Sequence, residues 1–183
     1  MQRLLLMCAL AVLAACSTLT SSRQISASTG TAMSTADAPE ALLAHLVGAW
    51  TLTGRMGAAS LEQSVTAKWT LQENYLEMHF LQSASSVPPN GNRYEALYVI
   101  GYEPATGQYF LHLFDIFGPG FSKTIGVGTR QGNSIRFEFP YSGGLLANTF
   151  TWEPEFDKWR MLLQEQDQSG NWAEFAVKTL NRK

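Results

Sequence analysis

The sequence predicts an all-β fold, a closed antiparallel up-and-down barrel of about ten strands with a short N-terminal capping helix. Aromatic residues and glycines are frequent, with 10 Phe, 6 Tyr, 5 Trp and 15 Gly among 183 residues. Such a composition is typical of strands joined by tight turns. Apolar and polar residues alternate along most segments after residue 50, as in strands with one buried face. Turn-forming residues interrupt this alternation at fairly even intervals up to residue 170.

Length and charge limit the classes of function. The chain is 45% hydrophobic and 15% charged, which suits one domain with a sizeable core. Its formal net charge is -2, and its one run of basic residues is the terminal pair Arg182 and Lys183. Proteins that bind nucleic acid usually carry clustered positive charge, so we expect no nucleic-acid partner.

The first fifteen residues predict an export signal. Arg3 supplies a positive start, and residues 4–15 form an apolar run. That run is shorter than the ~20 residues a membrane span needs, so a signal peptide is the better interpretation. The segment Leu13-Ala14-Ala15-Cys16 resembles the lipobox of bacterial lipoproteins, in which the peptide is cleaved before the cysteine and the cysteine carries lipid. An ordinary signal peptide that happens to contain a cysteine is the alternative.

The residues after Cys16 predict a membrane tether. Ser17 follows the cysteine, which by analogy with Gram-negative lipoproteins favours the outer membrane over the inner one. Residues 16–36 are mostly Ser, Thr, Ala and Gly and have too few large apolar side chains to fold, so we expect a linker. We therefore expect a cell-envelope protein that contacts the membrane through lipid on Cys16 and faces the periplasm.

Both cysteines, Cys8 and Cys16, lie within the first sixteen residues. The remainder of the chain therefore has no cysteine for a disulfide, a cysteine-based zinc site or a thiol nucleophile. The domain over residues 37–183 must be held together by packing and backbone hydrogen bonds.

A helix is predicted over residues 37–47, before the first strand. Asp37 is a suitable N-cap, Pro39 fits the first turn, and Glu40 has the capping-box position. Leucines at 42, 43 and 46 share one face, and Gly48 ends the helix.

The strand that begins at Trp50 places Trp50, Leu52 and Gly54 on one face. Similar alternation follows along the chain, and nine turn signals divide it into ten strands. A meander of that length usually closes, because closure removes exposed edges; a two-sheet sandwich is the alternative. The strands over 94–102 and 109–117 are apolar on both faces, which predicts that the helix, a loop or a partner covers their outer side.

Three segments resemble a known group of proteins. They are Leu46-Val47-Gly48-Ala49-Trp50, the stretch Gly101-Tyr102-Glu103-Pro104-Ala105-Thr106-Gly107-Gln108-Tyr109, and the final Arg182-Lys183. A helix, Gly-x-Trp and an antiparallel meander resemble the calycin barrels: lipocalins, fatty-acid-binding proteins and nitrobindin-like domains. The chain is most similar, over residues 40–183, to an uncharacterised bacterial calycin-like family of unknown function, with Glu103 in place of the usual Asp. The resemblance implies a fold without an activity, and structural roles for Gly48 and for Trp50 as a plug.

No catalytic or metal-binding motif stands out. His45, His79 and His112 have no metal-ligand spacing, so we expect no metal. Nitrobindin-like proteins bind haem through a histidine near the C-terminal end, whereas the last histidine here is His112. We expect no cofactor. Ser122 and Ser142 lack the nucleophile elbow, so catalytic residues are not assigned and an enzyme of unknown reaction ranks third among the functions.

The favoured prediction is non-catalytic binding of a small, mainly apolar ligand inside the barrel. Asp115 and Asn148 are polar residues on apolar faces, which predicts pairing within the fold or with a ligand. We expect a cavity of roughly 300–1,000 Å³, capped at one end by helix 37–47 and bordered at its mouth by the loop over 83–92. A ligand-free envelope scaffold or protein-interaction module is the alternative. The remaining candidate ligand contacts are Met78, Phe137, Phe150 and Met161.

Overall fold

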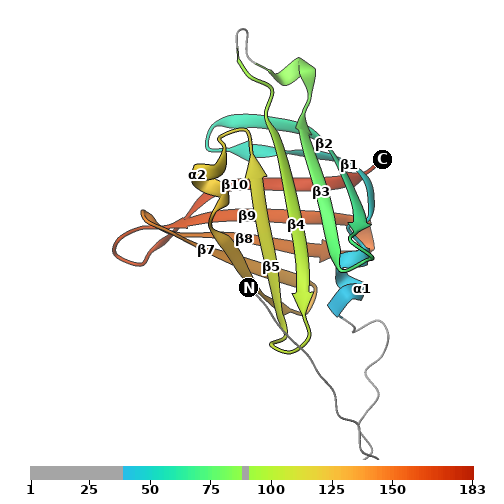
Figure 1. Cartoon of the computed structure of the whole chain (residues 1–183). Coiled ribbons are helices and arrows are strands. Elements are labelled where there is room, and N and C mark those ends of the chain that lie inside the picture. Colours follow the sequence, from blue (N-terminus) through green and yellow to red (C-terminus); the bar gives the residue numbers. More distant parts are fainter. Residues whose placement is uncertain (1–38, 88–90) are drawn as a thin grey trace, which may run out of the picture. The chain divides into compact units, whose positions relative to one another are not determined.

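The computed structural model describes residues 39–87 and 91–183, and across them ten strands form one closed antiparallel barrel (Figure 1). The predicted fold class is confirmed. The signal peptide, Cys16, the linker and the Asp37 cap lie outside the described residues. The strands are β1 (Gly48–Met56), β2 (Ala59–Thr70), β3 (Tyr75–Gln82), β4 (Glu95–Glu103), β5 (Gln108–Asp115), β6 (Ile125–Gln131), β7 (Ser134–Tyr141), β8 (Gly144–Glu153), β9 (Lys158–Gln166) and β10 (Trp172–Arg182).

Each strand pairs with its neighbours in sequence, and β10 closes the barrel against β1. In that closing ladder Trp50 lies opposite Arg182, and Met56 lies opposite Ala176. The helical elements are α1 (Pro39–Ala44), α2 (Pro119–Ser122) and the short 3-10 turns Ala84–Ser86 and Pro154–Phe156. Over the described ranges, no helix has both the length and the apolar character needed to cross a bilayer.

One end of the barrel is closed by α1 and the turns that follow it. Leu42, Leu43 and Leu46 are at most 3% exposed and belong to the main core. The indole Nε1 of Trp50 donates to the carbonyl oxygen of Leu46 at 2.7 Å, so the fully buried ring is fixed to the helical turn above it. The helix is shorter than the predicted 37–47: α1 ends at Ala44, and single backbone turns continue the chain to Val47.

Gly48 joins this cap to β1. Its φ of +132° is strained for any residue with a side chain, and an added Cβ would lie 2.9 Å from Nη1 of Arg182. Glycine is therefore required where the chain turns from the cap into the first strand, which begins two residues before the predicted Trp50.

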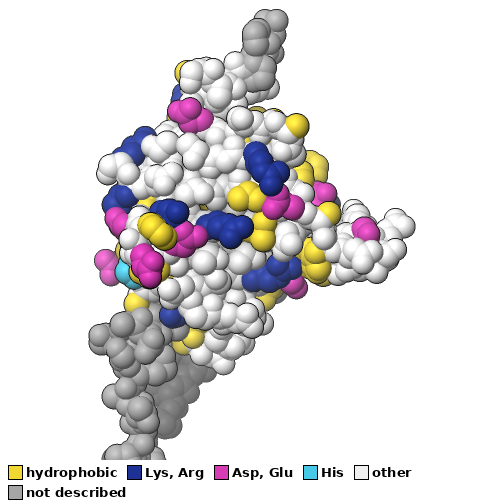
Figure 2. All heavy atoms as spheres, turned by 180° about the vertical axis from the view of Figure 1, so that it is seen from behind, with side chains coloured by type: hydrophobic (Ala, Val, Ile, Leu, Met, Phe, Trp, Pro, Cys, Tyr) yellow, Lys and Arg dark blue, Asp and Glu magenta, His cyan; other side chains and the backbone are white. Residues whose placement is uncertain are grey.

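The outer side of the barrel is mostly polar. Figure 2 shows one face, on which basic and acidic side chains are interspersed. Two of the ion pairs on the outer wall are Arg136 with Glu138 at 3.0 Å and Lys158 with Glu153 at 3.1 Å. Mixed charge of this kind agrees with the small net charge of the chain.

The outer side of β5 and β6 is the apolar exception. Phe114 and Ile125 are 43% and 40% exposed, so no described segment covers them. Of the three covers expected for the double-sided strands, helix 37–47 is excluded, because α1 packs into the closed end of the barrel instead. Cover by a partner stays a prediction. By contrast, Gly101 on the neighbouring strand β4 is buried, because the ring of Tyr75 lies directly over it.

Candidate functional site

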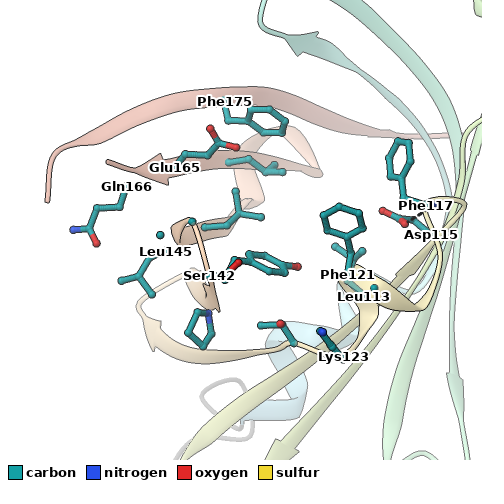
Figure 3. A pocket seen from close by; sticks show the side chains of 18 of the residues that line it. Leu113, Asp115, Phe117, Phe121, Lys123, Ser142, Leu145, Glu165, Gln166 and Phe175 are labelled. Atoms are coloured by element: carbon teal, nitrogen blue, oxygen red, sulfur yellow. Dashed lines mark hydrogen bonds between the residues drawn. The ribbon is translucent and has the colours of Figure 1, made fainter. Parts of the chain in front are cut away.

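A cavity of about 930 Å³ occupies the end of the barrel away from α1 (Figure 3). Its lining includes the ends of strands and the connections at that end, such as Met56 at the end of β1 and Gly143 between β7 and β8. Tyr94, just before β4, also lines it, whereas none of the described residues of the loop over 83–92, which sequence analysis placed at the mouth, is among the lining residues. The volume falls within the range typical of small-molecule sites.

Most of the wall is apolar. Leu113, Leu163 and Phe175 contribute aliphatic and aromatic surface from β5, β9 and β10. At the rim, Phe117 and Phe121 are 66% and 57% exposed, and their ring centroids lie 6.4 Å apart. Two neighbouring, exposed aromatic rings beside an apolar cavity form a surface that can contact an apolar molecule as it enters.

Three tyrosines surround Asp115 on one side of the cavity. Oδ1 of Asp115 accepts the backbone N–H of Phe117 at 2.9 Å. Burial raises the pKa of Tyr94, Tyr98 and Tyr141 above the usual value, and the negative charge of Asp115 raises each further. The three phenols therefore stay protonated and are hydrogen-bond donors at neutral pH. In the described ranges none of their hydroxyls has a hydrogen-bond partner, so they are available to a ligand or to water.

Lys178 is the buried charge of this site. It lies on β10, faces the interior and is 4% exposed, and it also lines the cavity. Within the described part of the chain its side chain forms neither an ion pair nor a hydrogen bond. Burial alone lowers the pKa of Lys178 to about 8. Sequence reasoning missed this residue, although the alternation of Ala176, Lys178 and Leu180 contains the signal.

The predicted ligand contacts fall into two groups. Asp115 lines the cavity. Asn148 is 1% exposed, and neither its Oδ1 nor its Nδ2 has a partner among the residues that the structure describes. It does not line the cavity; its β-sheet partners are Phe137 and Leu163. The other candidates, Met78, Phe137, Phe150 and Met161, point inward in packed layers of the core and are at most 1% exposed.

The histidines are dispersed. His45 stacks on Trp152 with ring centroids 4.7 Å apart, and Nε2 of His79 lies 2.6 Å from a carboxylate oxygen of Glu95. His112 is paired with Ile125 in the ladder between β5 and β6 and lies in the apolar outer region. Over residues 39–87 and 91–183, no three His, Cys, Asp or Glu side chains are grouped to hold a metal ion.

Comparison with known proteins places the chain in a family. The solved structure of Rv2717c from M. tuberculosis is similar, with a TM-score of 0.51 and 17% sequence identity over 77% of this chain and 94% of that chain. At that identity the likeness shows the fold alone. No curated protein matches the sequence. Residues 35–182 match the family model described as protein of unknown function (DUF1579), and the chain therefore belongs to the DUF1579 family.

Proposed function

We propose that this protein is a lipid-anchored periplasmic barrel that binds a small, mainly apolar ligand without catalysing a reaction. The observation that carries the proposal is the cavity of about 930 Å³, with its apolar wall and a few inward polar groups. That combination is characteristic of sites in which apolar surface supplies affinity and a small number of polar groups fix orientation.

The anchor is proposed from the sequence. The segment Leu13-Ala14-Ala15-Cys16 behind an apolar run supports lipid attachment at Cys16, and Ser17 supports the outer membrane. Residues 16–36, mostly Ser, Thr, Ala and Gly, separate this cysteine from the barrel in sequence. The exposed Phe117 and Phe121 at the rim suit a mouth that exchanges apolar molecules.

Binding without chemistry is supported by the side chains of the cavity. No histidine or cysteine is among its described lining residues, and no hydrogen bond joins the hydroxyl of Ser142 to a base in the described chain. Nucleophilic catalysis by a serine hydroxyl needs a base within hydrogen-bond reach. The polar groups present are phenols, aliphatic hydroxyls, an amide, carboxylates and amines, which suit recognition.

The test uses the full chain reconstituted in phosphatidylcholine nanodiscs and N-phenylnaphthylamine, a neutral apolar fluorophore. We expect saturable binding at one site. Leu146→Trp fills the cavity and should weaken this binding by at least about tenfold, because the occupied volume is no longer available. Thr129→Trp adds the same ring at an exposed position on β6 and should leave binding unchanged. Absence of saturable binding, or equal binding by both variants, would refute the proposal.

A further inference from the structure

We propose that the ligand is an amphipathic anion whose charged head binds Lys178 on the floor of the cavity while its apolar body lies toward the mouth. This inference rests on the proposed binding function and names the chemical class of the ligand.

The strand register places Lys178 at the floor. Its ladder partners are Met161 on β9 and Gly54 on β1. The next inward residue toward the closed end is Leu180, which pairs with Leu52 and Trp159, and all three are 0% exposed. That layer is fully packed and does not line the cavity. Lys178 is therefore the inward side chain of β10 that lines the cavity nearest to the closed end.

Gly54 leaves the β1 side of the lysine uncovered. A Cβ on Gly54 would lie 2.2 Å from the backbone oxygen of Val177 and 2.7 Å from Cα of Lys178, so β1 and β10 approach too closely there for any side chain. On β1, Met56 lines the cavity and Gly54 is the ladder partner of Lys178, and neither offers a polar side-chain group to the amine.

The amine has no counter-ion in the described chain. On β9 the inward residues beside it are Met161 and Leu163, both apolar. The acids of the cavity are Asp115 at the end of β5 and Glu165 near the mouth on β9, and neither is within ion-pair distance of Lys178. A buried ammonium without an anion is costly, and an anionic ligand supplies the missing partner.

The distribution of charge also sets the direction of the ligand. Asp115 and Glu165 lie toward the mouth and repel an anionic head at the rim, whereas Lys178 attracts it at depth. The other charged or titratable lining groups are Lys123, which is exposed at the rim, and the three neutral tyrosines. Because the wall between is mainly apolar, the molecule that fits has one anionic end and an aliphatic or aromatic body.

The test compares dodecanoate with dodecanol, which share a twelve-carbon chain and differ in head-group charge. Each displaces N-phenylnaphthylamine from the full chain in phosphatidylcholine nanodiscs at neutral pH. We expect dodecanoate to bind at least about tenfold more tightly than dodecanol, as a buried charge-assisted hydrogen bond warrants. Lys178→Met should remove this preference while keeping dodecanol binding. Lys68→Met removes an exposed lysine of β2 that does not line the cavity and should keep the preference.

A second readout needs no variant. As the pH rises from about 7 to about 10, the amine of Lys178 loses its proton and the carboxylate keeps its charge, so the preference for dodecanoate should decline in the unaltered protein. Equal affinity for both ligands, a preference that survives Lys178→Met, or a preference abolished by Lys68→Met would overturn the assignment. If neither ligand nor the fluorophore binds, the proposed function itself fails; if dodecanol binds and dodecanoate binds no better, only this inference fails.

Discussion

The guanidinium of Arg182 stacks over the indole of Trp50, with Cζ 4.1 Å from the ring centroid. Nε of the same guanidinium lies 2.7 Å from a carboxylate oxygen of Asp157, and Nη1 donates to the carbonyl oxygen of Val47 at 3.2 Å. One side chain from the last strand therefore joins the first strand, the turn after α1 and the β8–β9 connection. The closed end is held by this contact as well as by apolar packing.

Replacing Trp50 tests the closed end. Trp50→Ala should lower the free energy of unfolding by ~3–5 kcal/mol, because it empties a fully buried site and removes the surface on which Arg182 stacks. Trp50→Phe should cost less, since most of the apolar volume remains and only the bond to Leu46 is lost. Urea unfolding followed by circular dichroism measures both changes. Unaltered stability of Trp50→Ala would show that the ring does not plug the barrel.

The unpaired amide of Asn148 predicts a stabilising substitution. Asn148→Leu should raise the free energy of unfolding by about 1–3 kcal/mol, because it removes buried polar atoms that have no partner in the described chain and keeps a similar volume. Asn181→Leu, at an exposed position of β10, should change it by less than about 0.5 kcal/mol. A clear loss of stability for Asn148→Leu would mean that the amide is satisfied in solution by water or by a ligand.

Stability should vary with pH through Lys178 and the tyrosines. Burial lowers the pKa of Lys178 from 10.5 to about 8, so between these values the unfolded chain binds a proton that the folded chain has lost. The free energy of unfolding should therefore rise with pH from about 8 to about 10, by roughly 2–3 kcal/mol. Above about 10 it should fall, because the raised pKa values of Tyr94, Tyr98 and Tyr141 mean that the unfolded chain ionises first.

Urea unfolding at a series of pH values measures this profile. Lys178→Met should abolish the rise and keep the fall above about pH 10. Stability of the unaltered protein that is constant or falls between about pH 8 and 10 would contradict the assignment of a buried, unpaired lysine.

Lipidation is tested at Cys16. Cys16→Ser should abolish incorporation of an alkyne-labelled fatty acid and move the protein out of the membrane fraction, because it removes the thiol that we propose as the attachment point. Cys8→Ser, within the predicted signal peptide, should leave both unchanged. Continued acylation of the Cys16→Ser protein would exclude the proposed anchor.

The fold was predictable because alternation and turn signals report directly on strands. Within the described residues the predicted breaks, such as Pro104 to Gly107, coincide with connections between consecutive strands. A period of two identifies the inward face of a strand but not the height of a residue along the barrel. Phe137 and Met161 were therefore correctly placed inside, yet they lie in packed layers and not on the cavity wall.

Lys178 escaped sequence reasoning for a different reason. Lysine is rarely buried, so a lysine on a strand is normally assigned to solvent. The ladder between β9 and β10 also shifts register between Glu174 and Ala176. The ring of Trp172 lies against the guanidinium of Arg136 on the outer wall, so a regular alternation from Trp172 would also place Lys178 outside. The bulge reverses which residues face inward, and Lys178 faces the interior.

Closure of the barrel also governs how the chain can fold. Arg182 bonds to the carbonyl of Val47 across 135 positions of sequence, and β1 has its second neighbour only when β10 is present. Hairpins between consecutive strands can form as the chain is made, but their final arrangement has to wait for its last residues. Such non-local pairing slows folding, and until it is complete β1 and β9 each have an unpaired edge open to other chains. A product truncated before Trp172 would keep both edges, and we expect it to aggregate.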